Sequence, residues 1–238
     1  MIEKLLDAYE LKAKIFPGLV VALPILATAT YALPVLGSWA LFAASGICGL
    51  ALLFAIGQVV SARGEAIEAA LWDSWGGPPS TRYMRHRDTT FGAELKESIH
   101  GALIATFSVR LLSADEESKN AESADKAIAD AFRQVRPYLR EHDAGGLWFK
   151  HNIEYGFCRN LFACRGIWVL IAVCSLSVAI AYGVRTGVGA LNVASVIDGL
   201  SLVAALYVGW YVLPHAPKRD GERYAESAWM AFLRASRH

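Results

Sequence analysis

Residues 166–184 read GIWVLIAVCSLSVAIAYGV, a run of nineteen positions without a charged side chain. A helix needs roughly 20 apolar residues to cross about 30 Å of hydrocarbon, so this run is long enough to span a membrane. Within lipid a helix satisfies its own backbone hydrogen bonds, whereas irregular chain does not. The stretch is therefore predicted to be a transmembrane helix, because uncharged runs of this length are rare among the core helices of soluble proteins.

Three further apolar runs accompany it. They extend from Ile15 to about Leu36, from Trp39 to Ala62, and from about Val196 to Leu213. Only 19% of all residues are charged, against about 25% in an average soluble protein, and the deficit lies in these four runs. We therefore expect an all-α membrane protein with four transmembrane helices in a lipid bilayer.

The distribution of Lys and Arg predicts the orientation of these helices. Residues 62–165 contain fourteen of these side chains and the tail after Pro214 contains five, whereas the links at 34–38 and 185–195 contain none and one. Segments rich in Lys and Arg stay on the cytoplasmic side of a membrane. We thus expect a multi-pass protein of the bacterial inner membrane, with both termini and the large central segment in the cytoplasm.

This pattern divides the chain into five segments. They are an amphipathic N-terminal helix, a transmembrane hairpin, a cytoplasmic helical domain, a second transmembrane hairpin and a cytoplasmic C-terminal helix, at 1–14, 15–62, 63–165, 166–213 and 214–238. The region 62–165 has 15 acidic side chains beside its 14 basic ones. Such a balance indicates a folded domain, inserted between transmembrane helices 2 and 3, rather than a basic tail.

The spacing of apolar residues predicts that this domain is mainly helical. One buried stripe, with members three or four positions apart, consists of Ala124, Ile128, Phe132, Val135 and Leu139. We expect a further helix at 90–112, an acidic loop at 113–123, and a helix that runs from about Ile153 into the third span. Helix-favouring sequence also continues from the second apolar run to Trp75, where Gly and Pro residues follow.

The densest group of candidate ligand-binding residues surrounds the Gly-Gly-Pro-Pro turn at 76–79. Its aromatic and basic members are Trp72, Trp75, Arg82, Arg85, His86 and Arg87. Guanidinium groups bind phosphate oxygens through paired hydrogen bonds, and aromatic rings stack on bases. The pattern favours an anion site for a nucleotide or a single-stranded oligonucleotide. Two alternatives stay open: a basic collar on anionic headgroups, or an internal salt-bridge network with Asp73, Asp88 and nearby glutamates.

A second polar group precedes the third span. It consists of Lys150, Asn152, Tyr155, Arg159 and Asn160, and its members at 152, 155 and 159 share one helical face. This stripe could complete the same anion site, or it could be a capped and solvated helix face.

Gln58 and Asp198 are polar residues within the apolar runs. Ionisable residues in membrane helices usually face protein or water and mark functional positions, so both are candidate pore residues. Asp198 also lies near the outer boundary of its run, where simple exposure at the interface explains it almost as well.

Enzymatic signatures are missing from the sequence. There is no HExxH, no GxSxG, no Walker-type loop, and no CxxC pair among the four cysteines. We therefore expect a protein that is not an enzyme and that uses no metal or other cofactor.

Three motifs resemble a group of bacterial membrane proteins encoded in defence loci. They are Tyr9-Glu-Leu-Lys-Ala-Lys-Ile-Phe-Pro17, the block from Trp75 to Asp88, and Asn152-Ile-Glu-Tyr-Gly-Phe-Cys-Arg-Asn160, together about a fifth of the chain. The described type that they resemble is the Hailong-type channel effector of anti-phage defence. The resemblance implies a homo-oligomeric channel gated by a single-stranded DNA oligomer, which a nucleotidyltransferase encoded nearby would make. Opening would disrupt the membrane potential.

Size and composition also bear on two other classes of function, a scaffold and a small transporter. A four-span chain is too small to enclose a wide pore, so a channel requires a ring of identical subunits, and we expect a tetramer. The alternative is a membrane-anchored scaffold whose cytoplasmic domain binds a protein partner. A small transporter is disfavoured, because the chain has no internal repeat and one acidic residue in its spans.

Overall fold

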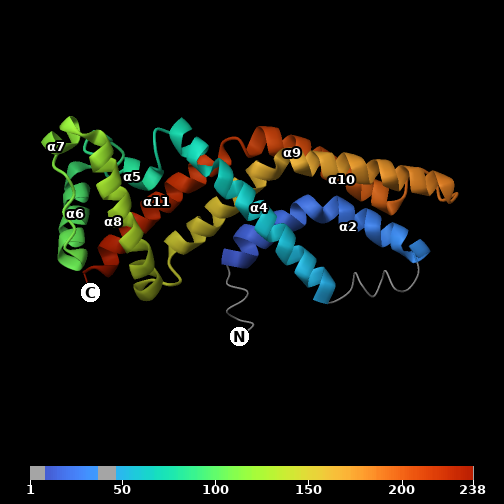
Figure 1. Cartoon of the computed structure of the whole chain (residues 1–238), viewed down its shortest axis with the longest axis horizontal. Coiled ribbons are helices and arrows are strands. Elements are labelled where there is room, and N and C mark those ends of the chain that lie inside the picture. Colours follow the sequence, from blue (N-terminus) through green and yellow to red (C-terminus); the bar gives the residue numbers. More distant parts are fainter. Residues whose placement is uncertain (1–8, 37–46, 238) are drawn as a thin grey trace. The chain divides into compact units, whose positions relative to one another are not determined.

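The computed structural model describes residues 9–36 and 47–237, and all regular structure in these ranges is helical (Figure 1). The chain forms two compact units. Unit 1 comprises Met1–Glu68 and Gly156–Pro217, and unit 2 comprises Ala69–Tyr155 and Lys218–His238. Three of the described helices contribute residues to both units.

Unit 1 is built from long apolar helices. Its elements are the π-helix η1 (Glu10–Ile15), α2 (Phe16–Leu36), the first part of α4 (Ile47–Ser74), the later part of α9 (Leu147–Arg185), α10 (Val193–Tyr207) and the π-helix η2 (Val208–Val212). Within the described ranges, three helical stretches are long and apolar enough to cross a membrane: Glu10–Tyr31, Leu147–Arg185 and Val193–Val212. The prediction of a helical membrane protein is confirmed. The start of the predicted second span, 39–46, lies outside the described residues.

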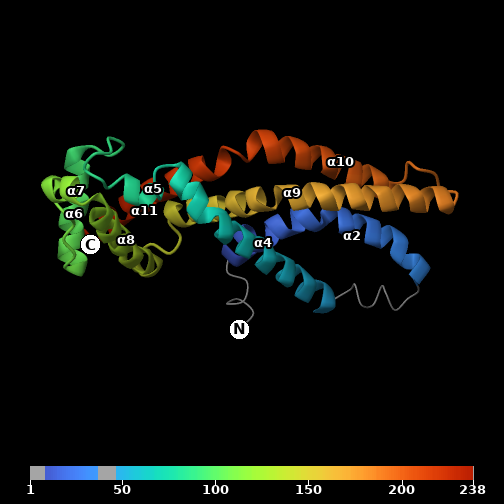
Figure 2. The same ribbon diagram turned by 45° about the horizontal axis from the view of Figure 1, so that its top comes forward.

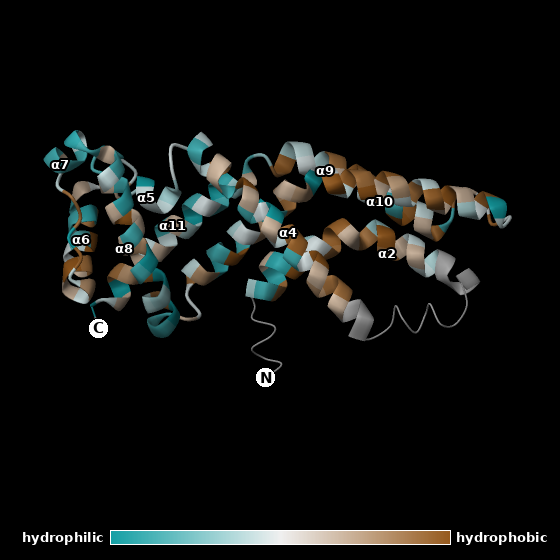
Figure 3. Ribbon diagram, in the orientation of Figure 1, coloured by the Kyte–Doolittle hydropathy of each residue, from teal (hydrophilic) through white to brown (hydrophobic). Residues whose placement is uncertain are grey.

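Much of the outer surface of unit 1 is apolar, which suits contact with lipid. Many large hydrophobic side chains are exposed, among them Leu23, Ile25, Leu52, Phe54, Leu170, Val178, Leu200 and Val203. Several polar side chains are buried instead: Ser175, Asn192, Ser195, Asp198 and Ser201. Figure 3 shows mainly hydrophobic residues along α2, the later part of α9 and α10. This arrangement is the reverse of a water-soluble surface, where large contiguous apolar patches are rare.

Helices α9 and α10 form a hairpin and lie side by side in both ribbon views (Figure 1 and Figure 2). Asn192 caps α10 by accepting a hydrogen bond from the Ser195 N–H at 3.0 Å, and its amide donates to the Ala179 carbonyl of α9 at 3.0 Å. Gly189 in the turn has a φ of +99°, which favours glycine. The Trp168 indole donates to Ser201 Oγ at 3.1 Å and joins the two helices further along.

Unit 2 is a bundle of shorter helices. It contains α5 (Pro79–Arg82), α6 (Ala93–Phe107), α7 (Ala114–Lys119), α8 (Ala121–His142), most of α11 (Ala216–Ala235), and the parts of α4 and α9 that lie in this unit. The helix expected at 90–112 is therefore shorter than predicted. Helix α4 ends at Ser74, just before the predicted break, and the predicted helix from Ile153 into the third span is confirmed as part of α9.

The prediction of an acidic loop at 113–123 is wrong, because residues 114–119 form α7. Ser113 and Glu116 make a capping box: the Ser113 N–H donates to Glu116 Oε2 at 2.7 Å, and Ser113 Oγ accepts from the Glu116 N–H at 3.4 Å. This Ser-x-x-Glu spacing is a known start signal for a helix. Three acidic residues in the first turn also suit the positive end of the helix dipole.

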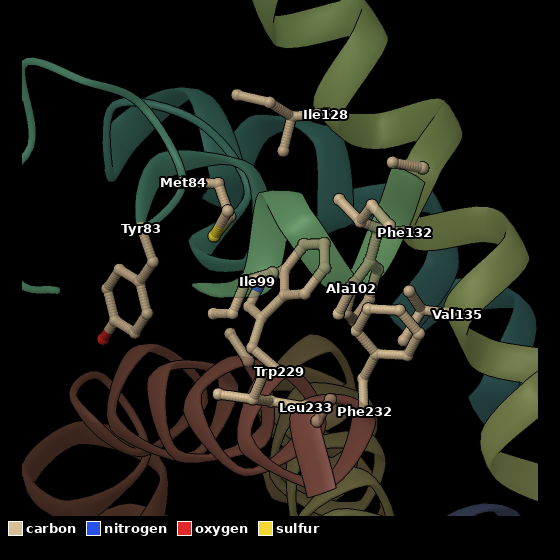
Figure 4. Close-up of a cluster of buried hydrophobic side chains, with 14 of the residues drawn as sticks. Tyr83, Met84, Ile99, Ala102, Ile128, Phe132, Val135, Trp229, Phe232 and Leu233 are labelled. Atoms are coloured by element: carbon tan, nitrogen blue, oxygen red, sulfur yellow. The ribbon is translucent and has the colours of Figure 1, made fainter. Parts of the chain in front are cut away.

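The C-terminal helix α11 completes the core of unit 2 (Figure 4). Trp229 and Phe232 have no exposed surface. The rings of Trp229 and Phe132 of α8 lie 5.1 Å apart, and the Trp229 indole donates to the Ser80 carbonyl at 2.9 Å. From Lys218 onward, the predicted C-terminal helix therefore forms part of the same folded unit as α6 and α8.

Candidate functional site

The Gly76-Gly77 turn sets the geometry of the predicted anion site. Gly76 and Gly77 have φ values of +80° and +113°, a backbone region that side chains disfavour. A Cβ at Gly77 would also lie 2.5 Å from Nη2 of Arg85. Pro79 then begins α5, a position where its missing N–H is harmless. Glycine is thus required at Gly77 both by conformation and by the approach of Arg85.

Arg85 is buried, and its guanidinium connects two segments of unit 2. Its Nε and Nη2 donate to the two carboxylate oxygens of Asp125, each at 2.7 Å, and its Nη1 donates to the Gly76 carbonyl at 2.6 Å. The bidentate geometry is the strongest form of this ion pair. The pair ties the 76–85 segment to α8, and the guanidinium fork is fully engaged.

Arg82 is engaged in the same manner. Its Nη2 donates to Glu222 Oε1 of α11 at 2.7 Å, and its Nη1 donates to the Trp75 carbonyl at 3.0 Å. Burial raises the pKa of the neighbouring Tyr83 to about 12, and the charge of Glu222 acts in the same direction. Glu222 thus offsets the positive charge of Arg82, as Asp125 offsets that of Arg85.

His86 and Arg87 are the exposed members of the cluster. The side chain of Arg87 is 52% exposed, and its guanidinium lies 3.7 Å from Glu117 and 4.0 Å from Asp125. Glu117 is buried on α7, and its Oε2 also accepts the His86 N–H at 2.8 Å. Helix α7, which the sequence interpretation missed, thus supplies a counter-charge to the cluster.

Arg82 and Arg85 are both ion-paired inside unit 2, as in the salt-bridge alternative, but among the described residues only one predicted partner takes part: Asp88 Oδ2 lies 3.6 Å from Arg82 Nε. The short contacts are to Glu222, 140 residues from Arg82, and to Asp125, 40 residues from Arg85, so sequence proximity could not reveal them. A polyanion at these two arginines would have to displace protein carboxylates. A polyanion at Arg87 would displace weaker contacts, because the guanidinium of Arg87 lies 3.7 Å from Glu117 and 4.0 Å from Asp125.

A small pocket opens beside the exposed edge of the cluster. It has a volume of about 320 Å³, and its lining includes His86, Asp88, Lys96 and His100. Lys96 is buried, and its ammonium donates to the carbonyls of Arg85, at 2.5 Å, and Asp88. The first turn of α6 also lines the pocket. The lining also contains the acidic side chains of Asp88 and Glu97, so the pocket carries groups of both signs.

His100 contributes an uncommitted polar atom to this pocket. Its buried Nε2 has no hydrogen-bond partner in the described part of the chain. Burial lowers the pKa of His100, and the neighbouring His86 and Lys96 lower it further. The sequence did not identify Lys96 and His100 as site residues. They lie on α6, away from the arginine motif, and a single Lys or His belongs to no recognisable binding motif.

The second predicted group is divided between the two units. Trp72 and Tyr155 meet in unit 2, where the Trp72 indole donates to the Tyr155 hydroxyl at 3.1 Å. Lys150 is exposed and Asn152 is half-buried in the same unit. Tyr155 of the second group therefore contacts Trp72 of the first, whereas a shared anion site stays a prediction.

Arg159 and Asn160 belong to unit 1, where they form a buried polar cluster. Arg159 Nη1 donates to Glu68 Oε1 at 2.6 Å, and its Nε and Nη2 donate to Asn160 Oδ1 at 3.2 and 3.1 Å. The Asn160 amide in turn donates to the Ala13 carbonyl at 2.8 Å. These contacts join α4, α9 and η1 within unit 1.

The two candidate pore residues occupy opposite environments. Gln58 is exposed on α4 among apolar neighbours. Asp198 has no exposed surface, and its Oδ2 lies 2.6 Å from Thr28 Oγ1. Among the described residues, nothing hydrogen-bonds to Asp198 Oδ1. Of the two, only Gln58 lies where a second copy of the chain or a bilayer could contact it.

These observations define a helical membrane protein that carries a charge-balanced helical unit. Within residues 9–36 and 47–237, no group of three or more His, Cys, Asp or Glu side chains is placed to hold a metal ion. Comparisons of the chain with protein-family models, curated proteins and solved structures gave no match.

Proposed function

We propose that this chain is the subunit of an oligomeric channel in the bacterial inner membrane that acts as an effector of anti-phage defence. A nucleotide or single-stranded DNA oligomer, bound to cytoplasmic unit 2, gates it, and opening disrupts the membrane potential. The proposal rests on one observation. The same chain has helices that can span a bilayer and a polar unit with a pocket lined in part by Lys96, His86 and His100. The resemblance of three motifs to the Hailong-type effectors supports the physiological role.

The proposal includes a fourth span over residues 39–62. The described part of this segment, the start of α4, exposes Leu52, Phe54 and Val59, which suits lipid or a second subunit. An even number of spans places both termini and unit 2 on the same side of the membrane. The excess of Lys and Arg in these regions favours the cytoplasmic side.

The proposal includes oligomerisation, because four transmembrane helices of a single chain are too few to enclose a wide pore. Four helices pack around side chains rather than around a wide aqueous pore. Gln58, which is polar and exposed on an otherwise apolar helix, is the best candidate for a position at a subunit interface or in a pore. A ring of four copies is the assembly that we expect.

The ligand-binding part of the proposal rests on the edge formed by His86 and Arg87. A phosphate at this edge would meet the guanidinium of Arg87 and the donors of the neighbouring pocket without breaking the Arg85–Asp125 pair. Trp72 and Trp75 are half-buried, so they are less accessible for stacking than His86.

Binding of a fluorescent single-stranded oligonucleotide to the detergent-solubilised protein tests this part. We expect Arg87→Ala to weaken binding and to reduce the slope of log affinity against log salt by about one, the value for one lost phosphate contact. Arg133→Ala is the matched control, because Arg133 is an exposed arginine of unit 2 that pairs with Asp130 on α8. Equal loss in both variants, or no loss in either, would reject the site.

Ion flux tests the channel itself. Purified protein in sealed liposomes should release a trapped ion in one ligand state and retain it in the other, and its expression without a partner should depolarise cells. Liposomes that stay sealed in every ligand state would contradict the channel.

The scaffold alternative gains from one specific observation. Arg82 and Arg85, the centre of the predicted anion site, are both bound to carboxylates of unit 2. A rigid, charge-balanced unit of this kind suits a protein partner as well as a nucleic acid. Sealed liposomes together with salt-insensitive oligonucleotide binding would favour the scaffold.

A further inference from the structure

One carboxyl group lies fully buried between three apolar helices of unit 1. Asp198 of α10 has no exposed surface, and its Oδ2 lies 2.6 Å from Oγ1 of Thr28 on α2. The same Thr28 Oγ1 lies 3.2 Å from the backbone carbonyl oxygen of Ser175 on α9. One hydroxyl therefore contacts two oxygen atoms at hydrogen-bonding distance.

Counting the hydrogens on these atoms restricts the protonation state of the group. A threonine hydroxyl carries one hydrogen, and a carbonyl or an ionised carboxylate carries none. With Asp198 ionised, Thr28 can satisfy one of its two contacts, and the other becomes an approach of two acceptors. With Asp198 as the neutral acid, its O–H donates to Thr28 Oγ1, and the Thr28 hydroxyl donates to the Ser175 carbonyl. Both contacts are then hydrogen bonds.

The surroundings of Asp198 favour the same state. The apolar segments 16–31, 166–184 and 193–212 contain no Lys, Arg or His and no second acid. Their other titratable groups are phenols and a thiol, which carry no positive charge in either protonation state: Tyr31, Cys174, Tyr182, Tyr207 and Tyr211. An unpaired carboxylate in an apolar interior costs so much free energy that such groups take up a proton instead.

A metal cation is a poorer partner for this carboxyl group. Ca²⁺, for example, takes roughly six to eight oxygen ligands, whereas the contacts described here join Asp198 and Thr28 to one backbone carbonyl. A proton needs only one acceptor, and Thr28 Oγ1 supplies it.

We infer that Asp198 is a proton-binding site of the membrane-embedded protein, held as a neutral acid that donates to Thr28. The resulting chain from Asp198 through Thr28 to Ser175 links α10, α2 and α9 by two hydrogen bonds. Release of the proton would leave a charge among apolar helices, so it requires water to enter between α2 and α10. The site lies inside one copy of the chain and does not depend on the proposed function.

Infrared spectroscopy of the whole protein in liposomes tests the protonation state directly. Labelling of the aspartate carboxyl groups with ¹³C separates their bands from those of glutamate. At neutral pH we expect one band in the region of neutral carboxylic acids, absent in Asp198→Asn and shifted to higher frequency in Thr28→Val, where the hydrogen-bond acceptor is lost. If Asp198→Asn does not fold, the shift in Thr28→Val still assigns the band. A wild-type spectrum with carboxylate bands alone would overturn the inference.

The nature of the bound ion is tested with a carbodiimide, a reagent that modifies protonated carboxyl groups in apolar surroundings. Mass spectrometry should locate the adduct on Asp198, and the extent of modification should not depend on Na⁺ or Ca²⁺. Glu116 is the internal control, because hydrogen bonds from Ser113 lower the pKa of this exposed carboxyl group. Protection of Asp198 by a cation, or loss of the infrared acid band when that cation is added, would show a cation site instead.

Discussion

The side-chain amide of Asn160 donates a hydrogen bond of 2.8 Å to the backbone carbonyl of Ala13, 147 positions earlier in the chain. In an α-helix the Ala13 carbonyl would accept the N–H of the residue four positions later. That residue is Pro17, which has no N–H. Residues 10–15 form the π-helix η1 at this point. In a π-helix the donor to this carbonyl is the N–H five positions later, that of Gly18. Asn160 therefore supplies a side-chain donor to a carbonyl whose α-helical donor is missing.

Replacement of Asn160 by alanine should destabilise unit 1. The variant would lose the bond to the Ala13 carbonyl and the Oδ1 acceptor of Arg159, and buried polar groups that lose a partner cost about 1–3 kcal/mol. We expect a lower unfolding temperature in detergent for Asn160→Ala. The control is Asn152→Ala, which removes the half-buried asparagine eight positions earlier on the same helix. Equal shifts in the two variants would mean that the bond to Ala13 contributes little.

Gly64 faces the same asparagine from α4. A Cβ at this position would overlap the Asn160 side chain. An alanine in a helix interior normally stabilises a protein by about 0.5–1 kcal/mol relative to glycine, so the expected sign is reversed here. Gly64→Ala should lower the unfolding temperature, whereas Gly101→Ala on α6, where no atom lies within 4 Å of the added Cβ, should raise it. A stabilised Gly64→Ala would show that Asn160 can move aside.

Arg85 and Arg87 should respond differently to alanine substitution, although the sequence groups them together. Arg85 is buried, whereas the side chain of Asp125 is 30% exposed. Loss of their charge-assisted hydrogen bonds should cost about 1.5–3 kcal/mol, so Arg85→Ala should unfold unit 2 at a clearly lower temperature. The exposed Arg87 should contribute about 0–1 kcal/mol. Arg85→Lys should not restore stability, because an ammonium cannot pair in the bidentate manner. Equal stability of Arg85→Ala and Arg87→Ala would remove the structural role of the Arg85–Asp125 pair.

The membrane helices were predictable from the sequence, because the length and the apolar composition of a segment are enough to identify such a helix. The run at 166–184 contains no charge, and the structure places it within α9. The missed helix α7 was predictable as well, since Ser113 and Glu116 carry the spacing of a capping box. The acidic residues at 113–123 favoured the prediction of a loop, although acidic side chains in a first turn also stabilise a helix.

The pairing of charges was not predictable in the same way. Asp125 and Glu222 stand on helices that are distant in sequence from Arg85 and Arg82, and tertiary packing alone brings them together. The sequence did contain a sign of the Asn160 contact, because Pro17 leaves a carbonyl without its helical donor. It could not show which side chain would replace that donor. The assignment of Asn160 to a ligand site stays a prediction.

Acidification should destabilise unit 2 through His100. Burial lowers the folded-state pKa of His100 below its ordinary value of 6.5, so the unfolded chain binds a proton more readily than the folded one. The contribution of the neutral ring to stability is thus full above about pH 6.5 and is lost as the pH falls toward the folded-state pKa. The loss cannot exceed about 1.4 kcal/mol per pH unit for one proton.

His100→Gln tests this pH dependence. The variant should show a flatter decline of unfolding temperature between neutral and mildly acidic pH than the wild type. His142→Gln, which replaces an exposed histidine of the same unit, should keep the wild-type decline. An unchanged slope in His100→Gln would assign the pH dependence to other groups.

Membrane embedding can be tested by placing the same charge on two exposed apolar positions. Leu200 on α10 is 66% exposed and Ile104 on α6 is 51% exposed. An arginine in the middle of a transmembrane helix costs about 2.5–3.5 kcal/mol during insertion, whereas an arginine on a water-exposed helix costs little. Leu200→Arg should therefore reduce the fraction of protein that resists alkaline extraction from membranes, and Ile104→Arg should leave that fraction unchanged. If both variants behaved as the wild type, the exposed face of α10 would lie outside the hydrocarbon, and the membrane assignment of that helix would have to be abandoned.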